Sequence, residues 1–157
     1  MAYPSARVRP PIFDSALQAA LERRAVEFLG LGLLALSGLT AMMFTSYAPE
    51  DPSWLSASDA PVQNILGSFG AMIAAPIMLI FGLSAWSLVA IQAVWGLRCL
   101  LHRGAYRALG RLIFAPFGVA VFAIYAAGLV PPASWGNNFG LGGLFGDTVL
   151  KTLLRLS

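Results

Sequence analysis

Residues 28–49 read FLGLGLLALSGLTAMMFTSYAP, and this stretch decides the fold class because it contains no Asp, Glu, Lys or Arg. About 20 apolar residues in a helix, each rising about 1.5 Å, cross a hydrocarbon core about 30 Å thick. We therefore predict a first transmembrane helix over about 28–47. Tyr47 suits the headgroup layer, and Pro49 and Pro52 end the helix because proline lacks a backbone N–H.

The composition extends this conclusion to the whole chain. Hydrophobic residues make up 58% of the 157 residues and charged residues 11%, whereas soluble domains contain about 25% charged residues. Too few charges remain to cover a soluble globule, so most of the apolar surface must contact lipid or other helices. The single cysteine, Cys99, excludes an intrachain disulfide and a four-cysteine metal site.

Two further crossing helices are expected. A second charge-free stretch predicts a transmembrane helix over about 70–97, kinked at Pro76, in which Trp86 packs against another helix. A third is predicted over about 112–130, where Pro131 stops it. After it, an interfacial amphipathic helix is predicted from apolar and charged faces at helical spacing, formed by Val149, Leu150, Leu153 and Leu154 and by Asp147, Lys151 and Arg155.

The predicted fold is an all-α integral membrane protein with three transmembrane helices and a C-terminal interfacial helix. Residues 1–27 form a cytoplasmic tail and a short amphipathic helix that continues directly into the first span. The membrane domain covers residues 28–157. Three crossings from an inside start leave the C-terminus outside, so we expect a fourth span beyond residue 157.

The distribution of arginines sets the orientation. Four arginines precede the first span, the 48–69 loop has no basic residue, and the 98–111 loop has four. The positive-inside rule therefore places the N-terminus and the 98–111 loop in the cytoplasm, and the loops 48–69 and 131–157 outside. Contact with anionic lipid headgroups, worth about 1 kcal/mol per residue, explains these side chains better than contact with DNA phosphates. The candidate headgroup contacts are Arg98, Arg103, Arg107 and Arg111.

No catalytic, cofactor or metal site is predicted. Glu50 and Asp51 have no histidine nearby in sequence to complete a catalytic group, and His102 with Cys99 provides only two ligands. The glycines of 136–146 do not match a dinucleotide fingerprint or a Walker A loop, and we predict a flexible hinge there. Small residues that would allow close helix packing, within the chain rather than in a dimer, are Gly67, Gly70, Ala71, Ala74 and Ala75.

One segment resembles a known family. SYAPEDPSW at 46–54 resembles the turn after the first helix in the N-terminal membrane domain of FtsK/SpoIIIE-type DNA translocases. The match continues with N-x-x-G-x-x-G-A at 64–71 and FGLGGLFGDTVLKTLL at 139–154, and it covers about 26–154. The resemblance implies a four-helix anchor in the bacterial inner membrane that holds a cytoplasmic hexameric ATPase at the division septum.

The leading hypothesis is therefore a non-enzymatic anchor and septal-recruitment module for cell division and chromosome segregation. Its partners would be the lipid bilayer and other division proteins or copies of itself, while DNA and ATP would be bound only by a motor outside these residues. The candidate structural or partner-contact loop contains Pro49, Asp51, Pro52, Ser53 and Trp54, and we expect Asp51 and Trp54 to set its shape. The alternative is a small accessory subunit of a respiratory, photosynthetic or transport complex.

Overall fold

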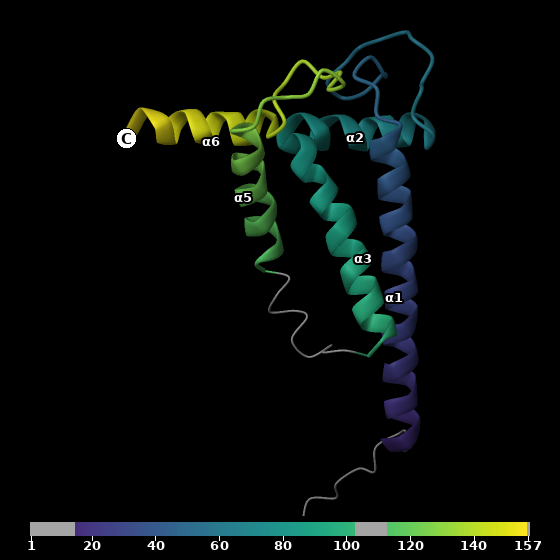
Figure 1. The fold of residues 1–157 in the computed structure, drawn as a ribbon. Helices are drawn as coiled ribbons and strands as arrows, with labels where there is room; N and C mark the ends of the chain where they lie inside the picture. The colour runs from purple at the N-terminus through teal and green to yellow at the C-terminus, as the bar shows by residue number, and fades with distance from the viewer. Residues whose placement is uncertain (1–14, 103–112, 157) are drawn as a thin grey trace, which may run out of the picture.

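A computed structural model describes residues 15–102 and 113–156, and every regular element in these two ranges is a helix (Figure 1). The all-α expectation is confirmed for this part of the chain. The elements are α1 (Ser15–Thr45), α2 (Gly67–Phe81), the short 3-10 helix η1 (Gly82–Ala85), α3 (Trp86–Leu100), α5 (Ala115–Ala127) and α6 (Gly143–Leu156).

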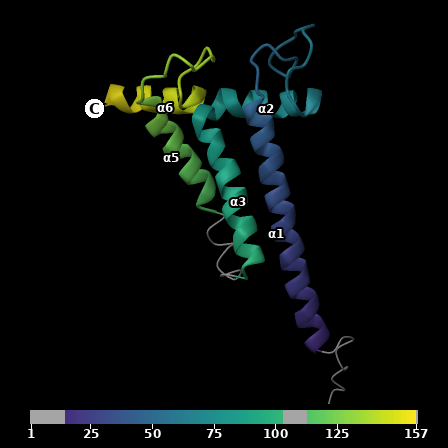
Figure 2. The same ribbon diagram turned by 45° about the vertical axis from the view of Figure 1, so that its right-hand side comes forward.

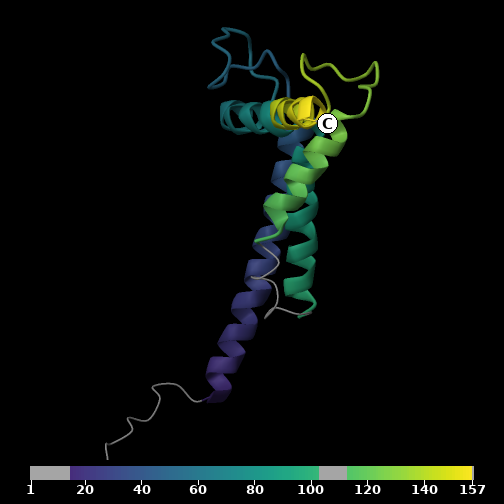
Figure 3. The ribbon, with the colours of Figure 1, turned by 90° about the vertical axis from the view of Figure 1, so that its left-hand side faces the viewer.

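The helices lie in two directions. The three helices α1, α3 and α5 run alongside one another, whereas α2 and α6 lie across their ends at one level (Figures 1, 2 and 3). The loops 46–66 and 128–142 lie on the far side of α2 and α6 from the body of α1 (Figure 1). The upright helices, the crosswise helices and the loops therefore form three successive layers.

Helix α1 joins two predicted elements. The short amphipathic helix and the first span form one continuous helix of 31 residues, as expected, and it ends at Thr45. By length and hydropathy, Ala16–Thr45 and Gly67–Leu100 are each sufficient to cross a membrane, and Ala115–Ala127 is a shorter apolar helix.

The predicted second span, 70–97, is not one kinked helix. Pro76 lies within α2, and the chain turns at Gly82, after which α3 runs down beside α1 (Figure 1). Gly82 has φ +56°, a backbone conformation that glycine adopts without steric cost. The prediction of a single helix kinked at Pro76 was therefore wrong. The chain changes direction at Gly82, because of the positive φ of that residue, and not at Pro76, where the proline removes a backbone hydrogen bond.

The third predicted span is shorter than expected. Helix α5 covers Ala115–Ala127 instead of 112–130, which gives a length of about 20 Å for 13 residues. After Ala127 the chain leaves the helix at Gly128, whose N–H donates to the Tyr125 carbonyl. Helix α6 forms as an amphipathic helix over 143–156, close to the stretch predicted for it, and lies across the bundle (Figure 3).

Helices α1 and α3 pack through glycines that the sequence reading did not single out. A Cβ atom on Gly30 would come within 2.8 Å of the Gly96 carbonyl oxygen, and a Cβ on Gly96 would come within 2.9 Å of the Gly30 oxygen. Further along, the Ser37 hydroxyl donates to the Val89 carbonyl over 2.9 Å. The two backbones are therefore close enough for small residues and a hydroxyl to replace bulky side chains at the contact.

The two helices also meet at the end opposite the loops. The Glu27 carboxylate lies 2.7 Å from the Arg24 guanidinium and 3.4 Å from Nε2 of His102, which follows α3. The hydrogen bond from Arg24, with the positive charges of Arg24, His102 and Arg23, lowers the pKa of Glu27. This group is solvated, so it adds little stability but marks the charged end of the bundle.

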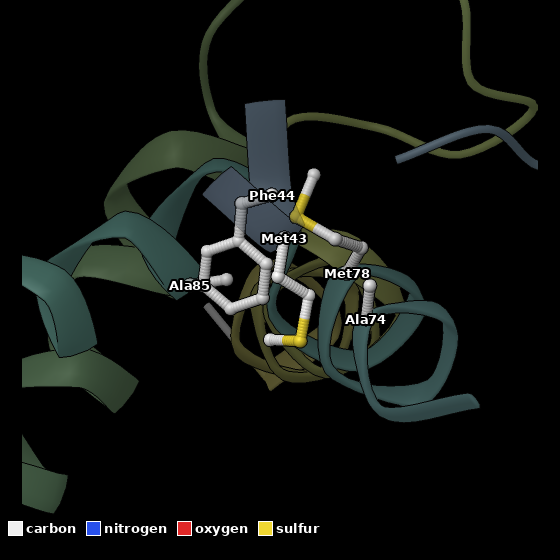
Figure 4. Close-up of a cluster of buried hydrophobic side chains, with 5 residues drawn as sticks. All are labelled: Met43, Phe44, Ala74, Met78 and Ala85. Atoms are coloured by element: carbon white, nitrogen blue, oxygen red, sulfur yellow. The ribbon is translucent and has the colours of Figure 1, made fainter. Parts of the chain in front are cut away.

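A small apolar core lies where α1, α2 and α3 meet. Figure 4 shows the side chains of this cluster, which are Met43, Phe44, Ala74, Met78 and Ala85. The Phe44 ring meets the Trp86 ring edge-on with a centroid separation of 6.0 Å. This contact confirms that Trp86 packs against another helix.

Candidate functional site

The loop between α1 and α2 folds back onto the end of α1. The Ser46 hydroxyl donates to the Met42 carbonyl over 2.7 Å and accepts the Ile65 N–H over 3.0 Å. The Asn64 amide donates to the Met43 carbonyl over 2.9 Å and accepts the Leu66 N–H over 3.1 Å. These bonds satisfy backbone groups at the end of α1 and at the start of α2, so both ends of the loop are fixed at one place.

Asp51 closes the loop from inside. Its side chain is only 3% exposed, and its two carboxylate oxygens accept the N–H groups of Gln63 and Asn64 over 2.8 and 3.0 Å. Hydrogen bonds to a charged acceptor are stronger than neutral ones. Asp51 thus accepts two backbone N–H groups from the other end of the loop, which is consistent with a role in shaping it.

The tip of the loop is a tight turn between Ser53 and Ser56. Their backbone groups bond reciprocally, over 3.0 and 3.3 Å, and the Ser53 hydroxyl accepts the Leu55 N–H. The two residues between them point outward, since Trp54 is 80% exposed and Leu55 is also exposed. The described contacts that hold the loop come from Asp51, Asn64 and Ser46, and the expectation that Trp54 pins the loop at the headgroup layer stays a prediction.

The two prolines of the candidate loop flank this frame. Pro49 is exposed and Pro52 is half-buried, on either side of the buried Asp51. The loop thus consists of a fixed frame and an exposed apolar tip. We call Ser53, Trp54, Leu55 and Ser56 the loop tip.

Four of the five predicted packing residues are buried. Gly70, Ala71, Ala74 and Ala75 lie on the inner face of α2, and a Cβ on Gly70 would come within 2.2 Å of the Asn64 side-chain oxygen. Gly67 differs from the prediction. A Cβ there would meet nothing within 4 Å, and its φ of +64° shows that it serves the backbone at the start of α2 instead.

The C-terminal part of the glycine-rich segment 136–146 forms a close-packed junction with its neighbours, and there the expectation of a flexible hinge is wrong. A Cβ on Gly143 would lie 2.4 Å from the Ile80 carbonyl oxygen, and one on Gly82 would lie 2.3 Å from the Leu141 oxygen. The Leu83 N–H also donates to Leu141 over 2.8 Å. On the other side, Gly142 and Gly146 rest on the Ala123 carbonyl of α5. The backbones of α5, α6 and the α2–α3 turn therefore meet with no space for side chains.

The arginine cluster is only partly visible. Arg98 lies half-buried in the last turn of α3, and the predicted contacts Arg103, Arg107 and Arg111 lie outside the described residues. Within residues 15–102 and 113–156, no group of three His, Cys, Asp or Glu side chains is placed to hold a metal ion.

Comparison with known proteins gives consistent matches. The family described as the 4TM region of DNA translocase FtsK/SpoIIIE matches residues 22–156. A DNA translocase FtsK of Brucella suis is 40% identical over 135 residues, covering 85% of this chain and 16% of its own length. One from Azospirillum brasilense is 31% identical over 150 residues, covering 94% of this chain and 24% of its own length. No solved structure matches the chain.

Proposed function

The chain belongs to the family of the 4TM region of DNA translocase FtsK/SpoIIIE, and on that premise we propose that it anchors such a translocase in the bacterial inner membrane and recruits it to the division septum. The observation that carries the proposal is the family match, which covers nearly the whole chain. The matched region is the membrane domain, and not the ATPase motor. The chain spans about a quarter or less of the length of the relatives it matches. A motor outside these residues would therefore carry out DNA translocation.

The arrangement of the helices supports the anchoring role. Long apolar side chains such as Phe28, Leu39 and Phe117 are exposed on the upright helices, as expected for surfaces that contact lipid. The arginine count places the N-terminus and Arg98 in the cytoplasm and the loop tip outside. The accessory-subunit alternative has no comparable observation in its favour.

Orientation can be tested by cysteine labelling. In a Cys99→Ser background, Ala57→Cys in the outer loop should react with an impermeant maleimide in intact cells. Leu101→Cys, at the exposed end of α3, should react only after permeabilisation. The opposite labelling pattern would refute the orientation, whatever the role of the domain.

The loop tip is the proposed partner contact. An exposed tryptophan next to an exposed leucine, on a turn held by the backbone bonds between Ser53 and Ser56, has the character of an interface anchor, because Trp buries a large area with few rotatable bonds. The partner would be another division protein or a second copy of the chain.

Replacing Trp54 by alanine should separate recruitment from folding. In a fluorescent fusion of the complete translocase, Trp54→Ala should keep its abundance and membrane association but lose about tenfold in affinity for its partner, seen as weaker septal enrichment. Val130→Ala, at a 90% exposed apolar residue of the second loop, is the matched control and should behave like wild type. Septal enrichment of Trp54→Ala equal to wild type at equal protein level would remove the loop tip from recruitment.

A further inference from the structure

Two parts of the chain share a sequence pattern. In the first, Ser53-Trp54 is followed by Gly67-x-x-Gly70 at the start of an apolar helix. In the second, Ser134-Trp135 is followed by Gly143-x-x-Gly146, again at the start of a helix. Each pattern follows an upright helix, α1 in the first case and α5 in the second.

The backbone repeats as well. Gly67 and Gly143 both have φ +64°, and each N–H donates to the carbonyl three residues earlier, over 2.8 and 3.0 Å. The glycines three residues further on are both buried, although their neighbours differ. A Cβ on Gly70 would meet the Asn64 side-chain oxygen, and one on Gly146 would meet the Ala123 carbonyl oxygen of α5. The agreements therefore cover backbone conformation and hydrogen bonding, and not only composition.

The two units are placed alike in space. In both, an upright helix leads through a loop into a helix that lies across the bundle, and α2 and α6 run in the same direction (Figures 1 and 2). The end of α2 meets the start of α6 where Gly82 contacts Gly143. The crosswise helices therefore form one row, and each belongs to a unit of the same design.

The lengths of the upright helices indicate the depth of this row. Helix α3 has 15 residues and α5 has 13, which correspond to about 22 and 20 Å. Neither length matches a hydrocarbon core about 30 Å thick, but a helix lying flat adds about 10 Å. The upright helices can then reach the far boundary of the hydrocarbon core only if the row lies inside that core, at its near boundary.

The side chains of the row fit this depth. Helix α2 has no charged residue, and Phe69, Met72 and Ile80 are exposed on it. Helix α6 exposes Leu153 on the face opposite Lys151 and Arg155, so it can face both acyl chains and headgroups. In water, exposed side chains of this size on a helix of 15 residues would be an uncovered apolar surface.

We propose that the domain is a tandem repeat of two L-shaped units whose crosswise arms, α2 and α6, form one row embedded in a single leaflet and bind its acyl chains. The orientation given under the proposed function makes this the outer leaflet. Only the choice of leaflet rests on that proposed orientation. The residues 70–97 thus cross the membrane only through their α3 half. Because of the row, the domain occupies a larger area in the leaflet that contains α2 and α6 than in the other leaflet.

Depth-dependent quenching tests the row in the 157-residue chain. Single cysteines carrying bimane, in a Cys99→Ser background, are compared in phosphatidylcholine vesicles that contain lipids with a quencher at a shallow or a deep acyl position. Phe69→Cys and Ile80→Cys lie on one face of α2 and should report the same shallow depth, and so should Val149→Cys and Leu156→Cys, which lie seven residues apart on one face of α6. On α1, Leu31→Cys and Leu39→Cys are the matched control and should differ by about 12 Å, because an upright helix changes depth by about 1.5 Å per residue.

The outcomes are distinct. A difference of about 16 Å between positions 69 and 80 would mean that α2 crosses the bilayer, and it would overturn the proposal. Quenching at positions 69 and 80 that is weak with both lipids would also overturn it, since protein rather than acyl chains would cover the row. Equal shallow depths together with reversed maleimide labelling would retain the row and refute only the orientation of the proposed function.

Discussion

Gly143→Ala is expected to destabilise the domain by about 2–6 kcal/mol, although it adds only one methyl group. The residue has φ +64°, where a side chain costs about 1–3 kcal/mol. The new Cβ would also lie 2.4 Å from the Ile80 carbonyl oxygen and 2.7 Å from the Gly82 nitrogen, so two backbones would have to separate. Overpacking of this kind typically costs a further 1–3 kcal/mol, roughly.

The measurement is the thermal unfolding of the purified chain in detergent, where a midpoint about 10 °C lower is expected. Gly118→Ala and Gly136→Ala are matched controls, because a Cβ at either position meets nothing within 4 Å and neither residue has positive φ. Gly82→Ala should resemble Gly143→Ala, and the double variant should lose less than the sum, since both residues belong to one contact. An unfolding midpoint of Gly143→Ala equal to that of Gly136→Ala would show that the junction is not close-packed.

The junction depends on contacts between distant parts of the chain, which the sequence alone does not predict. The apolar run 28–49 was sufficient to predict α1, because a charge-free helix of that length satisfies its own backbone and depends little on its neighbours. The turn at Gly82 depends on Gly143 and Leu141, which lie far along the chain, and nothing near residue 82 distinguishes it from a glycine inside a continuous helix. Pro76 was a better local signal for a bend, yet α2 continues through it.

The candidate site was predictable to a similar extent. Two prolines around an acidic residue indicate a turn, so Asp51 could be identified from the sequence as an acceptor of backbone N–H groups. Its partners at Gln63 and Asn64 could not, because they depend on the path of the whole loop. The contact of Gly30 with Gly96 was also missed, although a small residue seven positions later, Ser37, is a signal of a helix-packing face.

Asp51→Ala is expected to cost about 3 kcal/mol and to release the loop from the end of α1. The carboxylate is 3% exposed and accepts two N–H groups, and removing one partner of a buried hydrogen bond leaves the other unsatisfied at a cost of about 1–3 kcal/mol. The Asn64 N–H lies in the buried part of the loop, whereas water can reach the Gln63 N–H more easily. Losing the acceptor therefore costs more at the Asn64 N–H than at the Gln63 N–H. The total is below the roughly 6 kcal/mol that two fully buried N–H groups could cost.

A series of variants at this loop separates its frame from its tip. Asp51→Asn keeps the shape of the side chain but has one acceptor oxygen in place of two, so its loss of stability should fall between those of Asp51→Ala and Glu50→Ala. Glu50 is exposed and adjacent in sequence, which makes it the matched control. Thermal unfolding in detergent and the rate of proteolysis within 48–66 should follow the same order, with Trp54→Ala close to wild type because its side chain is 80% exposed. If Asp51→Ala is as stable and as resistant to protease as Glu50→Ala, the carboxylate does not hold the loop. If Trp54→Ala instead unfolds as early as Asp51→Ala, the tip is part of the frame, and its effect on septal placement could no longer be assigned to a partner.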